Sequence, residues 1–344
     1  MTFLRPTLLT LACLLASPGF ADDLPSLGDA SSAIVSPQQE YQLGRAWLAL
    51  LRSQVSQLND PQLKNYVETS VYRLVETSQL NDRRLEFILI NSPQLNAFAA
   101  PGGIVGVNGG LFLNAQTEGE YASVLAHELA HLSQRHFARG VEAQQRMQVP
   151  MMAALLAGIV IAAAGAGDAG IAAIAGTQAA AIQEQRRFSR QNEQEADRIG
   201  LQVLQRSGFD PQAMPAFLQK LADQASYSTR PPEMLLTHPL PETRIAEARS
   251  RAANFPRQSP HNEADFLFAK ARIQVRFSQE TPDGMLSYFE HQISRAGKQN
   301  HLLYGKALAL LALNRTQDAA VIINDLARRF PDDLFILDTQ TDID

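Results

Sequence analysis

Two histidines and a glutamate in "ASVLAHELAHLSQRH" (residues 122–136) have the residue types and the spacing of a metal-dependent hydrolase. His127 and His131 are four residues apart, so on a helix they lie about 40° apart on one face and both imidazoles can reach one ion. Glu128 lies about 60° further round from His131, close enough to hold a water on that ion. This pentad supplies two ligands and a base, and the site still needs a third ligand.

His136 is not predicted to be that ligand, because a continuing helix places it about 180° from His127. We expect it to be a surface or capping histidine. An astacin-like extension requires Gly three residues and His six residues after the second histidine of the pentad. Those positions hold Gln134 and Phe137, which excludes that subclass.

The stretch "SRQNEQEADRIG" (residues 189–200) is the second source of candidate ligands. On a helix, Glu193 and Asp197 share the inward face with small and apolar residues, whereas Glu195 points to solvent. Because an unpaired buried charge costs several kcal/mol, a divalent cation at Glu193 explains this pattern. Asp197 is then placed to accept the free ring N–H of a ligating histidine. The alternative is a salt bridge from the carboxylates to a neighbouring arginine: Arg186, Arg187, Arg190 or Arg198.

Further along the chain, "THPLPETRI" contains His238 and Arg244 in a loop and at a helix start that could fold back on the cleft. One or both could stabilise an oxyanion or position a substrate. His238 could instead occupy the open metal position in a latent state. The alternative without function is a loop histidine and a cation on a helix surface.

The N-terminus has the pattern of a secretory signal: a basic start, an apolar run too short to span a bilayer, and small residues before a cleavage site after Ala21. Cys13 is the only cysteine, so the mature chain has no disulfide or thiolate ligand, and a metal site must use His and carboxylate. Cleavage leaves 29 basic against 35 acidic residues, a charge of −6 without a basic run, which argues against nucleic acid as a partner.

Local patterns predict mostly helices around a small sheet, a mainly α (α+β) fold. The strand near Ile104–Val107 is expected to offer an edge to which an extended substrate adds. Residues 22–36 are expected to form a flexible leader. Predicted helices cover residues 37–57, 61–78, 118–139, 189–207 and 211–224, and predicted strands lie in 83–91 and on either side of 101–103.

Residues 149–167 are uncharged and rich in Ala and Gly. Their length would allow a transmembrane span, but Ala and Gly contribute little transfer free energy and no aromatic belt flanks them. A buried helical pair, or a lid that touches membrane or substrate, is favoured, with a peripheral membrane contact through residues 149–182.

The sequence pattern of the C-terminal part differs and predicts paired helices. Ala307, Leu310, Ala319, Ile323 and Pro331 fit one 34-residue tetratricopeptide unit. Residues 262–297 match less well, as a degenerate first repeat. Such units normally stack in threes or more, so the array is short here.

Taken together, HELAH, RQNEQEADRIG, HPLPETR and NAFAAPGGIVGVNGGL resemble the gluzincin metallopeptidases of the Ste and HtpX type. The resemblance covers about residues 37–250 for the peptidase and the tail more loosely. It implies a zincin-type domain with a small β-sheet and a Zn²⁺ ion held by His127, His131 and Glu193. It also implies that Glu128 is catalytic and Asp197 supporting, and that His238 and Arg244 are the family's downstream His and Arg.

The resemblance further implies a periplasmic zinc-dependent endopeptidase in outer-membrane protein quality control. Unfolded or misassembled outer-membrane proteins are then the substrates, and the helical repeats contact the barrel assembly machinery. The expected domains are a signal peptide (1–21), a leader (22–36), a peptidase (37–255) and a repeat region (260–344). Two rivals stay open: a helical-repeat chaperone or scaffold with a structural or vestigial metal site, and an integral membrane peptidase anchored through residues 149–167.

Overall fold

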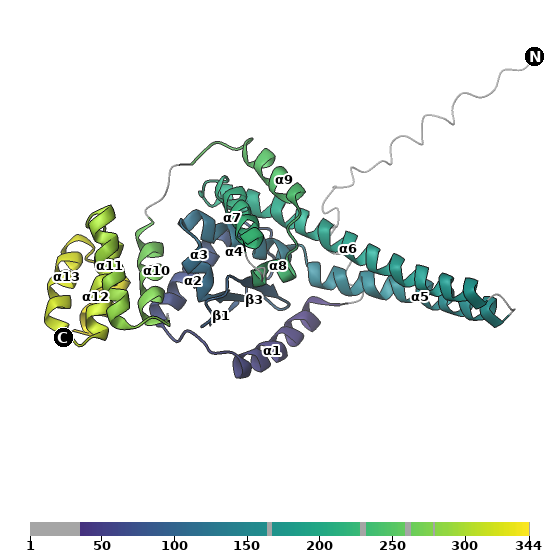
Figure 1. Cartoon of the computed structure of the whole chain (residues 1–344), viewed down its shortest axis with the longest axis horizontal. Helices are drawn as coiled ribbons and strands as arrows, with labels where there is room; N and C mark the ends of the chain where they lie inside the picture. Colours follow the sequence, from purple (N-terminus) through teal and green to yellow (C-terminus); the bar gives the residue numbers. More distant parts are fainter. Residues whose placement is uncertain (1–34, 164–166, 228–231, 259–262, 278, 344) are drawn as a thin grey trace, which may run out of the picture.

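The computed structural model describes residues 35–163, 167–227, 232–258, 263–277 and 279–343. The predicted signal peptide and most of the predicted leader lie outside the described residues. Figure 1 shows a central body between two helical extensions, a long arm at one end and a group of short helices at the other. The expectation of a mainly helical fold with a small sheet is confirmed.

The first two helices begin where the sequence places their caps. Helix α1 (Pro37–Gln54) has Ser36 as its N-cap in a capping box with Gln39. Helix α2 (Pro61–Val75) is capped by the Asp60 carboxylate, which accepts hydrogen bonds from two backbone N–H groups of the first turn. Both helices carry proline at the first position, where the missing N–H costs nothing.

The sheet has three strands in the order β1-β3-β2. Strand β1 (Glu86–Ile90) is parallel to β3 (Ile104–Asn108), and β2 (Ala97–Ala100) is antiparallel to β3. Residues 101–103 form the predicted turn, with Gly102 and Gly103 in the left-handed region at φ +77° and +78°. The expected edge at Ile104–Val107 is wrong, because β3 is paired on both sides. The edge strands are β1 and β2, and the outer side of β1 is partly covered by residues 56–58, where the Leu58 N–H donates to the Leu89 carbonyl.

Helix α4 (Glu118–Ser133) is the centre of the body. It packs against β2, α2, α6 (Gly167–Arg206) and α7 (Ala213–Tyr227), and most of its residues are buried. Short helices α3 (Gly109–Asn114), α8 (Glu233–Thr237) and α9 (Glu242–Ala252) complete the body. The predicted helix over 118–139 is not continuous: α4 ends at Ser133, Arg135 has φ +50°, and α5 (His136–Ala163) begins anew.

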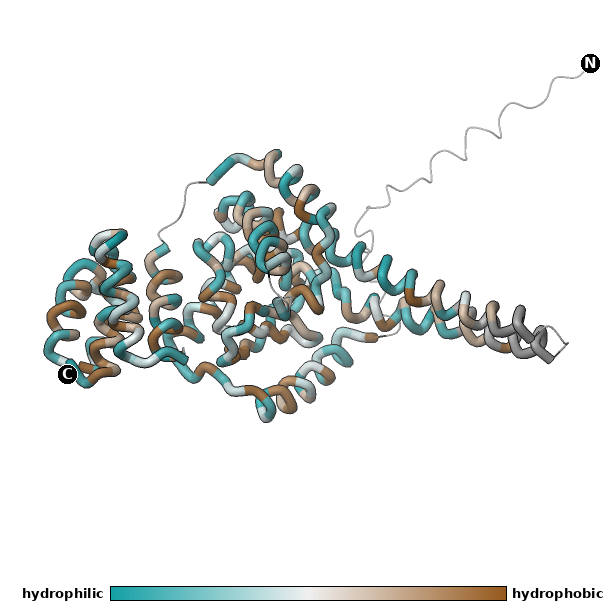
Figure 2. The backbone as a smooth tube through the Cα atoms, in the orientation of Figure 1, coloured by the Kyte–Doolittle hydropathy of each residue, from teal (hydrophilic) through white to brown (hydrophobic). Residues whose placement is uncertain are grey.

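The arm in Figure 1 is the antiparallel pair of α5 and α6. The predicted helix over 189–207 is the end of the 40-residue α6. Of the favoured interpretations, the helical pair is present, but its expected burial is wrong for the described side chains, since Met152, Leu156 and Ile182 are each more than half exposed. Hydrophilic and hydrophobic residues are mixed along the described part of the arm (Figure 2). In the part of the chain that the structure describes, no helix has both the length and the apolar character to cross a bilayer.

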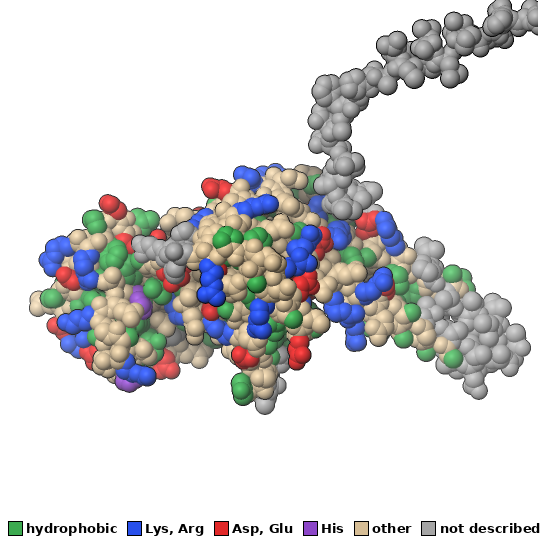
Figure 3. Space-filling view, turned by 90° about the horizontal axis from the view of Figure 1, so that it is seen from above, with side chains coloured by type: hydrophobic (Ala, Val, Ile, Leu, Met, Phe, Trp, Pro, Cys, Tyr) green, Lys and Arg blue, Asp and Glu red, His purple; other side chains and the backbone are tan. Residues whose placement is uncertain are grey.

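The other extension contains the paired helices that the sequence predicts. Helices α12 (Asn300–Ala312) and α13 (Thr316–Arg329) cover the residues of the predicted tetratricopeptide unit, and α10 (Ala264–Arg276) and α11 (Pro282–Ala296) precede them. Helix α14 (Leu334–Thr341) follows and, with α10, packs against α2. One apolar cluster runs from the body into this region, with the Phe266 ring against Phe112 and Tyr121. On the face in Figure 3, basic and acidic side chains are intermixed.

Candidate metal centre

Helices α4 and α6 cross so closely that their polar side chains meet inside the body. The contact depends on Gly200 of α6, where an added Cβ would lie 3.2 Å from both the Ala126 carbonyl carbon and the His127 backbone nitrogen. A side chain there would push the helices apart. Because α6 approaches in this way, Glu193 and Asp197 face the α4 histidines, as the helical pattern predicts.

Four side chains converge on one point. One ligand atom from each of His127, His131, Glu193 and His238 lies within 4.8 Å of the other three. The Nε2 atoms of His127 and His131 are 3.0 Å apart, and each is 3.4 Å from a Glu193 oxygen. Nδ1 of His238 is 3.1 Å from Glu193 Oε1 and 3.4 Å from His127 Nε2. An ion about 2.0–2.1 Å from four tetrahedral nitrogen or oxygen ligands separates them by roughly 3.3 Å, so this set fits a metal.

The outward ring nitrogens of the two α4 histidines explain why a cation belongs there. Nδ1 of His127 is 3.0 Å from Asp197 Oδ1, so its proton is held on that side and Nε2 carries a lone pair. Nδ1 of His131 is likewise engaged, by His136 at 2.8 Å. When both imidazoles are neutral, their lone pairs and the Glu193 carboxylate face one another in a buried space, an arrangement that repels itself unless a positive charge, a proton or a metal ion, lies between them.

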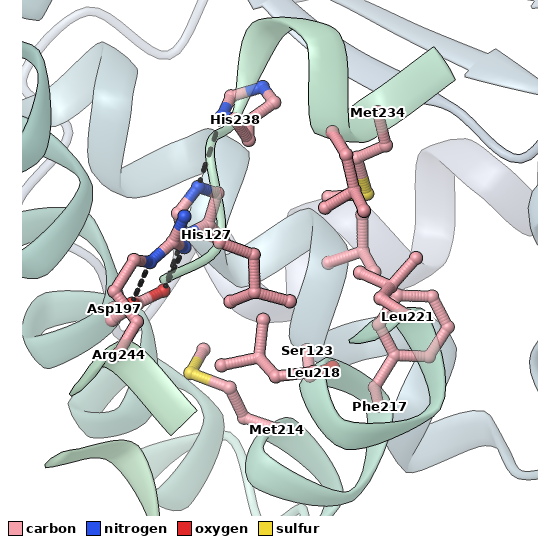
Figure 4. A pocket seen from close by; sticks show the side chains of 13 residues that line it. Ser123, His127, Asp197, Met214, Phe217, Leu218, Leu221, Met234, His238 and Arg244 are labelled. Carbon is pink, nitrogen blue, oxygen red and sulfur yellow. Dashed lines mark hydrogen bonds and ion pairs between the residues drawn. The ribbon is translucent and has the colours of Figure 1, made fainter. Parts of the chain in front are cut away.

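Arg244 lies behind the ligands and is itself buried. Its Nε and Nη2 atoms donate to the two oxygens of Asp197 at 2.7 and 2.8 Å, and Nη1 donates to Glu193 Oε2 at 2.7 Å. Nη1 also donates to the Pro239 carbonyl, next to His238. Figure 4 shows Arg244, Asp197, His127 and His238 in sequence along one side of an apolar cavity lined by α7 side chains. The alternative of a salt bridge to an arginine is met in part: both carboxylates pair with an arginine, but it is Arg244 and not one of the four neighbours in sequence.

The protonation of these groups follows their contacts. Burial lowers the pKa of His127, but its hydrogen bonds to Asp197 and Glu193 outweigh this and raise the pKa to about 10. Burial raises the pKa of Glu193, and hydrogen bonds from His127 and His238 reverse the shift and hold it well below the usual range. Burial lowers the pKa of His131 well below 6.5, and the positive His127 adds to the shift. The pocket therefore holds one positive charge, a proton on His127, and a metal ion bound there would replace that proton.

Glu128 lies beside the four candidate ligand atoms and lines a cleft. Its Oε2 accepts a hydrogen bond from the Ala99 backbone N–H of β2 at 2.9 Å. Its Oε1 has no hydrogen-bond partner among the described residues, with His238 Nε2 at 3.5 Å. Burial raises the pKa of Glu128, against the opposing effect of His238 and His127. The cleft of about 400 Å³ runs along the β2 edge, lined by Phe98 to Gly102.

Two residues near the site are not where the sequence suggested. His136 was expected at the surface, but it is 7% exposed and contacts His131. Glu195 was expected in solvent, but it is partly buried and pairs with Arg139 at 2.8 Å and with His136 Nε2 at 3.3 Å. The first error comes from assuming one unbroken helix over 118–139, and the second from assuming that α6 is packed on one face only, whereas α5 packs against it as well. The break at Arg135 involves neither Gly nor Pro, so the sequence carried no local signal for it.

The class of the protein follows from these features and from the family comparison. Residues 61–252, more than half of the chain, match the model of peptidase family M48. The chain belongs to peptidase family M48, and it is a metalloendopeptidase of this class. The family implies a metal in the site, and the ligand geometry fits one.

Sequence identity to individual relatives shows which members of the family the chain is similar to. The chain is 42% identical over 335 residues to the beta-barrel assembly-enhancing protease of Escherichia coli K12, covering 95% of this chain and 68% of that protein. It is 41% identical over 325 residues to the protein of the same name from Yersinia pestis, covering 94% and 66%. Mitochondrial metalloendopeptidase OMA1 of Schizosaccharomyces pombe is 29% identical over 197 residues, 56% of this chain and 55% of that protein. The chain thus spans about two thirds of the length of the beta-barrel assembly-enhancing proteases.

Proposed function

We propose that this chain is a zinc endopeptidase that cleaves unfolded or misassembled outer-membrane β-barrel proteins in the periplasm and aids their assembly. The observation that carries the metal chemistry is the convergence of the His127 and His131 lone pairs with the Glu193 carboxylate beside an unpartnered oxygen of Glu128. Two His and one Glu with an exchangeable fourth position are the ligands of a catalytic zinc.

Bound zinc would supply Lewis-acid chemistry, polarising a peptide carbonyl and lowering the pKa of water. Glu128 takes the proton of the attacking water at Oε1 and returns it to the leaving amine. The Ala99 N–H holds Oε2 of Glu128, so the other oxygen stays turned to the cleft. Asp197 and Arg244 position the ligands: Asp197 fixes the His127 tautomer, and Arg244 aligns both carboxylates.

The edge of β2 is the natural place for substrate backbone. An extended peptide that adds to Ala97–Ala100 forms main-chain hydrogen bonds beside Glu128. Such recognition reads unpaired backbone more than side chains, and a stalled β-barrel strand offers that backbone. This supports the substrate class suggested by the name of the relatives, beta-barrel assembly-enhancing protease.

His238 supports a latent state, because its Nδ1 occupies the position of a fourth ligand. Cleavage then requires the loop after α8 to move His238 away from the metal so that water and the scissile carbonyl can enter. Arg244 contacts this loop at Pro239 and the ligand Glu193 together, so its buried contacts favour positioning over direct oxyanion stabilisation.

The remaining assignments rest on the pattern of the chain. The N-terminal signal pattern supports export to the periplasm, and the paired helices α10 to α13 support a docking surface for the barrel assembly machinery. The exposed apolar side chains of the α5/α6 arm support a peripheral membrane contact within residues 149–182.

The proposal is tested on purified mature protein prepared without added metal. Elemental analysis should find about one zinc per chain, and an unfolded casein-type substrate should be cleaved only while the zinc is present. Chelator should stop cleavage and zinc should restore it. Stoichiometric metal with no cleavage of any unfolded substrate, including an unfolded outer-membrane protein, would instead indicate a scaffold with a structural metal.

Replacing His238 by Ala separates its two interpretations. If His238 is a latency ligand, the variant should cleave faster than wild type at equal zinc occupancy. If it stabilises the oxyanion, kcat should fall by about 10²–10³-fold with little change in KM. Leu236→Ala is a matched control in the same segment, since Leu236 is exposed and should leave cleavage unchanged.

A further inference from the structure

The two α4 imidazoles are supported in different ways on their outward sides. His127 meets a carboxylate, Asp197, which is the common partner of a metal-bound histidine. His131 meets another neutral ring: its Nδ1 lies 2.8 Å from Nδ1 of His136, and the two rings stand nearly perpendicular. The proposed function names roles for Asp197 and Arg244 but none for His136.

The proton arrangement between these rings follows from geometry. Nε2 of His131 faces His127 and Glu193, so it must be unprotonated to bind a metal, and the ring proton is on Nδ1. This Nδ1–H donates to Nδ1 of His136. The proton of His136 is therefore on Nε2, where it donates to Glu195 Oε2 at 3.3 Å, and the Arg139 guanidinium holds that carboxylate at 2.8 Å.

We propose that His136 is a positioning residue that fixes the tautomer and ring orientation of His131, with Glu195 and Arg139 fixing His136 in turn. His136 is not a fifth ligand, because its nearer nitrogen faces the outward side of His131. The inference rests on the proposed metal site. It adds a chain of hydrogen bonds that runs from the partly exposed Arg139–Glu195 ion pair through His136 to His131.

The interruption of the helix between α4 and α5 is what brings the His136 ring against His131. On an unbroken helix it would point away from His127. Arg135 adopts φ +50° and is held there by Glu40 of α1, which accepts from its Nε and Nη2 at 2.9 and 2.7 Å, and by the Val35 carbonyl at 2.7 Å. A left-handed non-glycine residue is costly and persists only where surrounding contacts over-determine it. These contacts turn the first residue of α5 back toward His131.

The test compares two replacements of His136 that differ in hydrogen bonding. In His136→Gln, the amide oxygen can accept from His131 and the amide N–H₂ can donate to Glu195, whereas His136→Phe keeps a ring and loses both bonds. Zinc affinity is measured by competition with a chromophoric chelator. His136→Phe should weaken zinc binding about 10–100-fold, and His136→Gln should stay within about 3-fold of wild type.

Glu195→Gln provides a milder, independent arm. This side chain is partly exposed, so the variant should fold, and we expect zinc binding weakened about 3–10-fold because the tautomer is less firmly held. His301→Phe in the repeat region is the matched control, a largely buried histidine without a part in the site, and should leave zinc affinity unchanged. Circular dichroism of each zinc-free variant reports its fold.

The outcomes separate this inference from the function on which it rests. Wild type that binds no zinc ends the metal-site proposal and this one with it. Wild type that binds zinc, together with a folded His136→Phe of equal affinity, overturns the role of His136 alone. Equal weakening in the Phe and Gln variants also overturns it, since a packing role would not distinguish them. If His136→Phe does not fold, unchanged affinity in Glu195→Gln overturns the role of this chain of hydrogen bonds.

Discussion

Among the residues that the structure describes, two buried arginines each join two carboxylates, and they serve different purposes. Arg244 in the candidate metal centre binds Glu193 and Asp197. Arg272, on α10 where the repeat region meets the body, binds Asp60 and Asp338. Both networks pair an arginine with two carboxylates. They differ in whether every buried polar atom has a hydrogen-bond partner.

The Arg272 network is closed. Its Nε donates to Asp60 Oδ2 at 2.7 Å and its Nη1 donates to the Tyr304 hydroxyl at 3.0 Å, and that hydroxyl is 3.0 Å from Thr339 Oγ1. Among the described residues, no buried side-chain atom of this group lacks a partner. Asp60 also caps α2, so the network ties α2, α10, α12 and α14 together.

The Arg244 network is open on one side. Beyond the arginine, the ring nitrogens of His127 and His131 converge on the Glu193 carboxylate, and Glu128 Oε1 lacks a hydrogen-bond partner among the described residues. A buried polar network that is left unsatisfied costs free energy, and such sites are retained where a ligand or a reaction completes them. The network without unsatisfied atoms, around Arg272, therefore stabilises the fold. The network with an unsatisfied carboxylate oxygen, around Arg244, is the one suited to bind a ligand or carry out a reaction.

The largest expected effect is at the open network. Glu128→Gln should lower kcat for an unfolded substrate by about 10²–10⁴-fold, because an amide cannot accept the proton of water. Zinc content should be unchanged, and the Gln oxygen can still accept from the Ala99 N–H. Thermal stability should stay equal or rise, since a buried carboxyl is removed. Cleavage at the wild-type rate would end the assignment of Glu128 as the base.

At the closed network the effect should fall on stability instead. Arg272→Met leaves Asp60 buried without its main partner, and we expect a loss of about 3–5 kcal/mol in the free energy of unfolding by denaturant titration. Arg276→Met is the matched control, because Arg276 shares the same Asp60 but is partly exposed, and it should cost at most about 1 kcal/mol. Equal losses in both variants would contradict the distinction between them.

Arg244→Lys sharpens the assignment of the other arginine. A lysine cannot donate to both oxygens of Asp197 and to Glu193 together, so zinc affinity should fall about 10–100-fold. Arg249→Lys on the exposed side of the same helix should leave zinc affinity unchanged. Wild-type zinc affinity combined with a large loss of kcat would favour the alternative in which Arg244 contacts the transition state.

The smallest expected effect is a pH dependence at the junction. Asp333 caps α14, and burial and the neighbouring Asp265 raise its pKa to about 6. The folded state then binds a proton that the unfolded state has already lost, so stability falls as pH rises from about 4 to about 6. Asp333→Asn keeps a capping oxygen and removes this loss. Its melting temperature should exceed that of wild type by about 1–3 °C at pH 8 and match it at pH 4.

Much of the fold was predictable because its signals are local. Ser36, Asp60 and the prolines that follow them fixed where α1 and α2 begin, and the Gly102-Gly103 turn fixed the β2–β3 hairpin. The central position of β3 was not predictable, because β1 pairs with β3 across a long connection and such pairing depends on contacts distant in sequence. For the arm, the sequence favoured a buried helical pair or a lid; the pair is present, but the described side chains Met152 and Leu156 are exposed.

For the site, helical periodicity on α4 and α6 placed His127, Glu128, His131, Glu193 and Asp197 on the correct faces, since a repeat of 3.6 residues is a property of the chain itself. Only the tertiary structure showed that His238 converges on the same point, that Arg244 binds both carboxylates, and that His136 contacts His131. These contacts depend on loops and on one left-handed residue whose conformation is set by packing from other parts of the chain, and no local pattern encodes that packing.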